Sequence, residues 1–288
     1  MRTLGFVNGT TAPKNTPVVG FIGLGDQGLP MASAVAEAGF ALRVWARRPA
    51  SLEPLAGIPH QAADSVEDLA ASCDVVALCV GTDEDVERLI AQMLPHLRSG
   101  AIVVNHGTGV PAIATRLAEQ CVARQVAVLD APVSGGRTAA EKKRLTCMVG
   151  GPDAAFEQCR PVFEAFSAHV VHLGQTGAGQ TAKLFNNALL MLNQRSIADI
   201  IALVDQLDLD LLSLLDVLKL ASGASAALSL LNTMVRTDNV EHLSKVEALD
   251  MELFDQAMRD AGIRAEEVTE RGLSGARSLP ALLTRLNG

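Results

Sequence analysis

The chain has 288 residues, of which 49% are hydrophobic, and a formal net charge of -8. This length and apolar content can fill two ordinary cores, so we expect two domains. An acidic chain is not attracted to nucleic acid or to an anionic membrane, and the charge therefore favours a small-molecule substrate. No apolar run reaches the ~18 residues of a membrane span, and the first residues lack the apolar core of a secretory signal. We expect a soluble, cytoplasmic protein.

Residues 1–16 are polar and aperiodic, and they predict a flexible N-terminal extension. From Pro17 the chain reads as a strand (PVVGFIG), a glycine turn, a helix rich in small residues and a second strand (FALRVWAR). Five further strand-like segments alternate with helical ones, at residues 74–80, 101–105, 126–130, 145–150 and 169–173. This alternation predicts an α/β fold, with a doubly wound Rossmann-type parallel sheet in a dinucleotide-binding domain over residues 17–176.

The pattern becomes helical after Gly179. Residues 181–207 predict one long helix, and the remaining chain is Leu- and Ala-rich helix with short breaks. We therefore expect residues 177–288 to form an all-α C-terminal domain for substrate binding and dimerisation, joined to the sheet by the long helix. A broad apolar face of that helix is expected to be shared between subunits of a homodimer or higher homo-oligomer. It carries Leu184, Ala188, Met191, Ile197, Ile201 and Val204.

The glycine turn has the pattern Gly-x-Gly-x-x-Gly between a strand and a helix. Gly23 permits the tight turn, Gly25 lets the backbone approach a pyrophosphate at the helix N-terminus, and Gly28 lets the helix lie close to the sheet. The alternative is a glycine turn that binds nothing. We predict a dinucleotide site made by the whole turn: Gly23, Leu24, Gly25, Asp26, Gln27 and Gly28.

The end of the second strand favours NADP over NAD as the cofactor. An acidic residue here would bind the ribose hydroxyls of NAD, but the chain has Ala46, Arg47 and Arg48. Arginine forks pair well with phosphate, so we expect Arg47 and Arg48 to bind the 2′-phosphate of NADP. The alternative is that both arginines are simply solvated.

Two later segments carry groups suited to an active site. The sequence DAPVSGG at 130–136 offers the Ser134 hydroxyl and the N–H groups of Gly135 and Gly136, which suit a small carboxylate. Lys183 and Asn187 then lie one helical turn apart. A lysine beside a carbinol can take its proton while nicotinamide takes hydride, and burial beside the oxidised ring would lower its pKa from ~10.4. The alternative is a lysine that reaches solvent from a helix end.

Together these motifs resemble the β-hydroxyacid dehydrogenase family, which includes 3-hydroxyisobutyrate dehydrogenase and the glyoxylate and succinic semialdehyde reductases. The resemblance runs from Pro17 to Asp250 and is carried by GLGDQGLPMA, VWARRP, DAPVSGG with LTCMVGG, and GAGQTAKLFNN. It implies a 6-phosphogluconate dehydrogenase-like fold and a catalytic Lys183. It also implies that Asn187 orients the substrate, that Ser134, Gly135 and Gly136 hold its carboxylate, and that Val80, Gly81 and Thr108 lie along the cofactor.

The chain departs from the family pattern at three places. Gln27 replaces a common methionine, the segment after DAPVSGG is basic rather than glycine-rich, and Leu249-Asp250 stands where the family commonly has Lys-Asp. We predict an NADP-dependent oxidoreductase that transfers hydride between nicotinamide and a small β-hydroxyacid or the corresponding aldehyde or keto acid. The alternatives are a reductase of imines or other non-acid substrates and a non-catalytic NADP-binding sensor.

Other residue types narrow the chemistry. The chain contains no tyrosine, which excludes reductases with a Tyr-Lys pair or a tyrosine proton donor. A histidine-based 2-hydroxyacid dehydrogenase stays possible in principle through His106, His169 or His172, although none lies in a specific motif. The five cysteines form no Cys-x-x-Cys pair, so we expect mostly buried thiols and no metal site.

Overall fold

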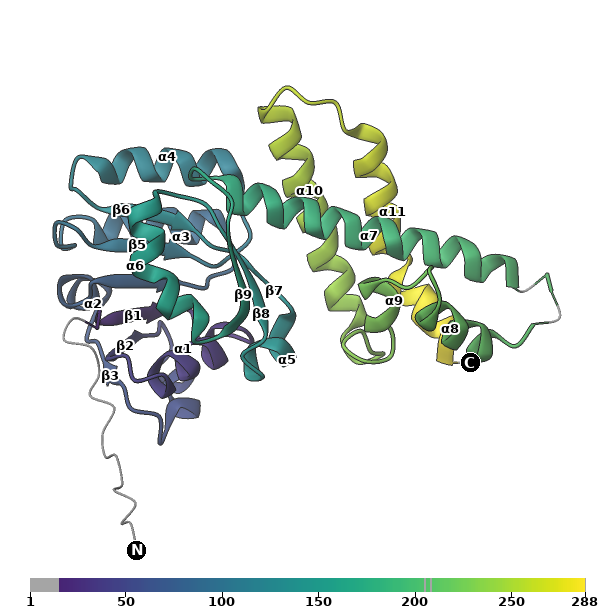
Figure 1. Ribbon diagram of the computed structural model, residues 1–288, viewed down its shortest axis with the longest axis horizontal. Helices are drawn as coiled ribbons and strands as arrows, with labels where there is room; N and C mark the ends of the chain where they lie inside the picture. The colour runs from purple at the N-terminus through teal and green to yellow at the C-terminus, as the bar shows by residue number, and fades with distance from the viewer. Residues whose placement is uncertain (1–15, 205, 208, 288) are drawn as a thin grey trace, which may run out of the picture.

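The computed structural model describes residues 16–204, 206–207 and 209–287. Apart from Thr16, the predicted N-terminal extension lies outside the described residues. Figure 1 shows a part built around a β-sheet and a purely helical part, connected by one long helix. None of the helices in the described ranges is long and apolar enough to cross a membrane.

Six short strands form a parallel sheet in the order β3-β2-β1-β4-β5-β6. Their bounds are β1 (Val19–Ile22), β2 (Leu42–Trp45), β3 (Gln61–Ala62), β4 (Val75–Leu78), β5 (Ile102–Asn105) and β6 (Ala127–Asp130). The strand order reverses direction between β1 and β4, and doubly wound sheets bind their ligands at the carboxyl ends of the strands beside such a point. The predicted fold class is confirmed.

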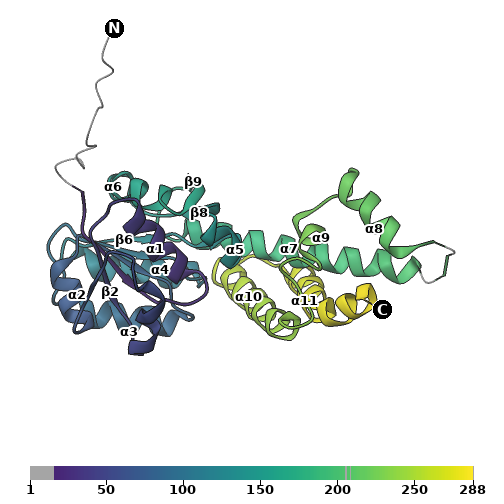
Figure 2. The same ribbon diagram turned by 90° about the horizontal axis from the view of Figure 1, so that it is seen from below.

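Helices cover both faces of this sheet, as the two views show (Figures 1 and 2). They are α1 (Gly28–Glu37), α2 (Val66–Ser72), α3 (Asp83–Met93), α4 (Pro111–Val122) and α6 (Asp153–Glu164), with a 3-10 helix η1 (Pro49–Leu55) after β2. Neighbouring residues of one strand serve opposite faces: Phe21 packs with α1 and α6, whereas Ile22 packs with α2, α3 and α4. Burial on both sides explains why the strands are continuous apolar runs in the sequence.

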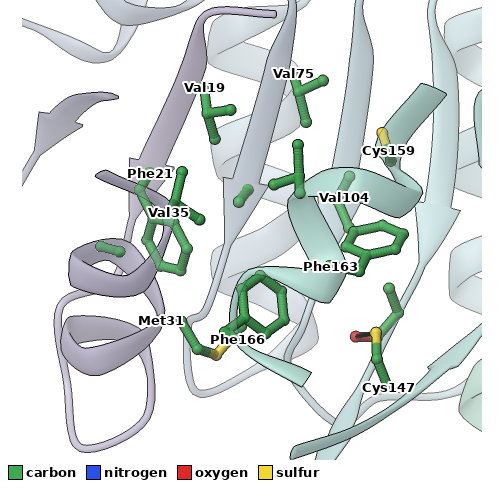
Figure 3. Close-up of a cluster of buried hydrophobic side chains, with 14 of the residues drawn as sticks. Val19, Phe21, Met31, Val35, Val75, Val104, Cys147, Cys159, Phe163 and Phe166 are labelled. Carbon is green, nitrogen blue, oxygen red and sulfur yellow. Dashed lines mark hydrogen bonds between the residues drawn. The ribbon is translucent and has the colours of Figure 1, made fainter. Parts of the chain in front are cut away.

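The core on the α1 and α6 side is aromatic (Figure 3). Phe21, Phe163 and Phe166 are fully buried there, with Met31 and Val35 from α1. Cys147 and Cys159 lie in the same core as free thiols. Burial raises the pKa of the Cys159 thiol to about 12. These thiols are therefore packing residues.

The last two predicted strands form a second, smaller sheet instead of extending the parallel one. β7 (Val133–Ser134) pairs antiparallel with β8 (Leu145–Val149), and β8 pairs parallel with β9 (Ser167–His172). The short helix α5 (Gly136–Glu141) connects β7 to β8. After β6 an antiparallel bridge joins Asp130 to Gly150, so the chain past β8 runs against β6 and the parallel order stops there.

The C-terminal region is entirely helical, as predicted. It contains α7 (Ala178–Val204), α8 (Leu211–Leu220), α9 (Ala226–Leu230), α10 (Val240–Asp260) and α11 (Glu266–Asn287). α7 is the long connecting helix, and α10 and α11 cross it and pack against it (Figures 1 and 2). It begins at Ala178 rather than Thr181, and Leu207 already lies in a turn that bonds back to Val204. The domain boundary at residues 176 and 177 stays a prediction.

The predicted apolar face of α7 is covered within the chain itself. Leu184, Ala188 and Met191 pack against α10, and Ile201 packs in a separate core with α11. The expectation that this face is shared between subunits therefore does not fit the fold. A different face of α7 exposes large apolar side chains, namely Phe185, Leu189, Ile200 and Leu203.

Candidate active site

The glycine turn between β1 and α1 has the close contacts that its sequence predicts. Gly23 has φ +98°, and a Cβ on it would lie 2.2 Å from the carbonyl oxygen of Cys79. A Cβ on Gly28 would lie 1.8 Å from the carbonyl oxygen of Gly23. At Gly25 a Cβ would meet nothing within 4 Å. Two glycines are thus required by packing within the protein, and the third leaves its backbone open to a ligand.

A cleft of about 450 Å³ lies beside this turn, where β1 and β4 end. Seven of the residues predicted to bind the cofactor line it: Gly23, Leu24, Gly25, Arg47, Arg48, Val80 and Gly81. Of the others, Asp26 is exposed and lies 3.5 Å from the Arg137 guanidinium. Gln27 is half-buried at the start of α1. The cleft and the open Gly25 backbone fit a dinucleotide phosphate at the N-terminus of α1.

The opposite wall of the cleft was missed by the sequence reasoning. Asp85, Arg88 and Gln92 line it from α3, and Arg88 pairs with Asp85. Their spacing places all three on one helix face, which a helical wheel could have shown. It could not have shown that this face turns toward the glycine turn, since that depends on the packing of α3 against the sheet.

Asp130 connects the DAPVSGG segment to the start of α7. Its carboxylate is fully buried, and it accepts the backbone N–H of Gly177 at 2.7 Å and that of Gln180 at 2.8 Å. These N–H groups have no helical partner in the first turn of α7, so the carboxylate caps that turn. A Cβ on Gly179 would lie 2.5 Å from the Asp130 carbonyl oxygen, so a larger residue would push α7 away.

Gln180 ties α7 to the loop that follows β5. Its side chain is buried, accepting the N–H of Gly109 at 2.9 Å and donating to the carbonyl of Gly107 at 2.7 Å. The predicted cofactor residue Thr108 lies between these two glycines and is half-buried. Lys183 follows three residues later on the same helix. The Gln180 side chain therefore couples the Thr108 loop to the helix that carries the lysine.

Lys183 belongs to a partly buried polar cluster between α7 and α10, in which Asn187 is buried and Lys183 and Asp250 are half-buried. Asn187 donates from Nδ2 to Asp250 Oδ2 at 2.8 Å across 63 residues of sequence, and the charge of Asp250 acts on Lys183. Burial lowers the pKa of Lys183, and Asp250 opposes this change. Burial raises the pKa of Asp250, which Lys183 and Asn187 oppose. Sequence reasoning placed Lys183 and Asn187 together but gave Asp250 no role. Leu249, which stands where the family commonly has lysine, is 57% exposed.

The predicted carboxylate-binding loop lies at the β7–α5 junction. Gly135 and Gly136 have φ values of +127° and +65°, which favour glycine. A Cβ on Gly136 would lie 2.4 Å from the terminal methyl of Met234. Met234 comes from the helical part, where Asn239 Nδ2 donates to its carbonyl at 2.9 Å. The helical part thus covers the loop beside Ser134. No local pattern in the sequence indicates this contact.

The histidines lie elsewhere. His106 is buried, its Nδ1 is 2.8 Å from the carbonyl oxygen of Ala131, and its ring contacts those of Phe163 and Phe166. Burial lowers the pKa of His106 to about 4, so it is neutral at physiological pH. His172 stacks on Phe156. These histidines are packing residues. In the part of the chain that the structure describes, no cluster of three or more His, Cys, Asp or Glu could hold a metal ion.

The fold and the glycine turn define a dinucleotide-binding protein of the Rossmann class. The model of the NAD-binding domain of 6-phosphogluconate dehydrogenase matches residues 18–174. The model described as NAD-binding of NADP-dependent 3-hydroxyisobutyrate dehydrogenase matches residues 177–271. Both parts of the chain therefore match models of NAD-binding dehydrogenase domains.

Individual relatives of the chain are dehydrogenases as well. The chain is 36% identical over 217 residues to the NAD-dependent L-serine dehydrogenase of Pseudomonas aeruginosa, covering 74% of this chain and 73% of that protein. It is 34% identical over 217 residues to the 3-hydroxyisobutyrate dehydrogenase of the same species, covering 74% and 73%. The structure of Mycobacterium tuberculosis 3-hydroxyisobutyrate dehydrogenase with L-serine superposes with a TM-score of 0.84 at 26% identity, covering 95% of this chain and 100% of that one. The chain belongs to the β-hydroxyacid dehydrogenase family of NAD(P)-dependent oxidoreductases, which confirms the resemblance.

Proposed function

We propose that the protein is an NADP-dependent dehydrogenase that interconverts a small β-hydroxyacid and the corresponding aldehyde or keto acid. The observation that carries the proposal is the partly buried group of Lys183, Asn187 and Asp250. Asp130 ties the helix of this group to the predicted carboxylate loop, and Gln180 ties it to the predicted cofactor loop. Substrate, cofactor and base would then meet at one helix end.

The preference for NADP is inferred from the rim of the cleft. Arg47 and Arg48 line it after β2, and both are exposed. A 2′-phosphate there would receive charge-assisted hydrogen bonds from the two guanidinium groups. The L-serine dehydrogenase relative is named as NAD-dependent, so the arginines are the specific support for NADP in this chain.

In the proposed mechanism Lys183 moves the proton. The glycine turn with Arg47 and Arg48 would hold NADP, which would supply the hydride acceptor for oxidation and, as NADPH, the hydride donor for reduction. The neutral amine of Lys183 takes the hydroxyl proton during oxidation, and its ammonium gives a proton to the carbonyl oxygen during reduction. A pKa lowered by burial makes the neutral form accessible. Asn187, already fixed by Asp250, would orient the reacting oxygen.

The substrate carboxylate would bind at the β7–α5 junction. There the Ser134 hydroxyl and the N–H groups of Gly135 and Gly136 are donors, and α5 begins at Gly136. Hydroxyacids are the substrates that the names of the relatives give: L-serine for one and 3-hydroxyisobutyrate for another. Which hydroxyacid this chain uses is to be found by assay.

We also propose a homodimer or larger homo-oligomer in the cytoplasm. Its support is the set of large apolar side chains exposed on the helical part: Phe185, Leu189, Ile200, Leu203, Leu212 and Leu220. Large apolar side chains left exposed on one helix face, as the four of α7 are, indicate a contact with another protein. Light scattering at micromolar concentration should give at least twice the monomer mass. A stable monomer would contradict this part of the proposal.

A substrate panel tests the function. Short-chain hydroxyacids with NADP, and semialdehydes, keto acids and imines with NADPH, are assayed by the absorbance of the reduced cofactor, with NAD and NADH in parallel. We expect turnover of an acid substrate and preference for NADP. Turnover of imines alone would favour a reductase of non-acid substrates. NADPH binding without any turnover would favour the sensor.

A further inference from the structure

A second polar pair lies between α7 and α10, next to the Lys183 cluster. Gln194 is two helical turns beyond Asn187 on α7, and Glu247 is one turn before Asp250 on α10. Gln194 Nε2 donates to Glu247 Oε1 at 2.9 Å. Gln194 is 2% exposed and Glu247 is 9% exposed. A carboxyl group is therefore buried close to the proposed active site, with no role in the mechanism above.

The pair leaves one oxygen on each side chain without a partner. Glu247 Oε2 and Gln194 Oε1 are both buried and make no hydrogen bond within the described residues. An ionised carboxylate has only acceptors and can give nothing to Gln194 Oε1. A neutral carboxylic acid has one O–H donor, which could form the hydrogen bond that Gln194 Oε1 lacks. A single proton would thus satisfy both free oxygens.

The surrounding charges also favour the neutral acid. Asp250 is the charged group that acts on Glu247, and it is a carboxyl group too. On α7, Lys183 acts on Asp250, while Arg195 pairs with Asp199. On α11, Arg271 pairs with the same Asp199. Lys183, Arg195 and Arg271 therefore act on other carboxylates, and no cation is among the groups that shift the pKa of Glu247. Burial is the main cause that raises the pKa of Glu247, to about 7.

We propose that Glu247 is a neutral carboxylic acid in weakly acidic solution, where ordinary glutamates are already ionised, that it donates from Oε2 to Gln194 Oε1, and that it is a positioning residue for Lys183. Its neutrality leaves Asp250 as the one carboxylate that sets the charge beside the amine. At higher pH Glu247 loses its proton, and a second negative charge then favours the ammonium form of Lys183. This second half rests on the proposed function, whereas the protonation of Glu247 does not.

The protonation is tested on the wild-type protein. With ¹³C in the glutamate carboxyl carbons, an NMR titration should show one resonance that titrates at about pH 7 and that is missing in Glu247→Gln. Glu247→Gln should fold, because its amide can donate to Gln194 Oε1 and accept from Nε2 as the neutral acid does. Glu241→Gln is the matched control, since it removes an exposed carboxyl group from the same helix. Titration of every glutamate in the ordinary range would overturn the proposal, even if Glu247→Gln did not fold.

The link to Lys183 is tested by the pH dependence of kcat for reduction. We expect the alkaline loss of activity to have its midpoint at lower pH in Glu247→Gln than in wild type, with Glu241→Gln unchanged. The same midpoint in all three proteins would remove the positioning role while leaving the neutral acid intact. A wild-type profile without an alkaline loss would count against the proposed role of Lys183 itself, and the NMR titration would still decide on Glu247.

Discussion

The dinucleotide cleft and the Lys183 cluster are built in opposite ways. The cleft lies at strand ends beside the backbone of the glycine turn, is open to solvent and has two exposed arginines at its rim. The Lys183 cluster is made by side chains of two helices, and its main hydrogen bond joins residues 63 positions apart. Water screens the charges in an open cleft, so an unpaired charge costs little there. In a cluster with little access to water, each charge needs a partner of opposite charge or a hydrogen bond. Substitutions should therefore have larger and more coupled effects in the cluster than in the cleft.

The largest effect is expected for Lys183→Met. Loss of a general acid–base group typically costs ~10²–10⁴ in kcat, and NADPH binding should be retained because Lys183 does not line the cleft. Lys245→Met is the control, because Lys245 is an exposed lysine on α10. Steady-state kinetics and a cofactor titration measure both quantities. A Lys183→Met protein with near wild-type turnover would contradict the mechanism.

The next effect concerns the rim of the cleft. Each charge-assisted bond to a 2′-phosphate contributes ~1.5–3 kcal/mol, or roughly 10- to 150-fold in affinity. Replacing Arg47 and Arg48 by alanine should weaken NADPH binding by at least this factor and leave NADH binding nearly unchanged, which makes NADH the internal control. Equal losses for the two cofactors in a binding titration would show that the arginines do not recognise the phosphate.

Asn187→Ala should have a smaller effect, about tenfold in kcat/KM, because the side chain orients and transfers no proton. It also leaves Asp250 without the amide that donates to it. Because Asn187 and Lys183 share this partner, their effects should not add in the double variant. Strict additivity in a double-mutant cycle would mean that the two residues act independently, and the description of one coupled cluster would fail.

The smallest effect is expected at the carboxylate loop. An alanine at position 136 must adopt a positive φ and displace the methyl group of Met234, which is the flexible end of a side chain. We expect a cost of about 1–3 kcal/mol in unfolding free energy and a several-fold higher KM with little change in kcat. The variant Gly136→Ala/Met234→Ala should recover part of the KM. No recovery would show that Met234 does not limit this site.

The same contrast explains what the sequence could predict. The glycine turn and the strand alternation are local patterns, so Gly23, Gly25 and Gly28 and the parallel sheet were predictable. Arg47 and Arg48 were also predictable as cleft residues, because they directly follow the end of the second strand in the sequence. Asp85 and Arg88 could not be placed in the cleft, because the sequence does not give the orientation of α3.

Only the members of the Lys183 cluster that lie on α7 could be predicted from the sequence. Lys183 and Asn187 share one helix, and helical spacing is sufficient to pair them. Asp250 and Met234 reach the site only through the packing of the helical part, for which the sequence has no local signal. The buried face of α7 is a second example. The sequence showed that this face is broad and apolar, but not that α10 and α11 of the same chain cover it.

The central claim, that Lys183 moves the proton, is tested most directly by the pH dependence of kcat/KM in both reaction directions. Oxidation needs the neutral amine and should rise as pH passes the pKa of Lys183. Reduction needs the ammonium and should fall as pH passes the pKa of Lys183, which burial places below the ordinary value of 10.5. The predicted result is two opposite profiles, with the midpoint for oxidation no higher than that for reduction because the oxidised ring is positively charged, and both absent from the residual activity of Lys183→Met. Profiles that change in the same direction, or that persist in Lys183→Met, would contradict the account.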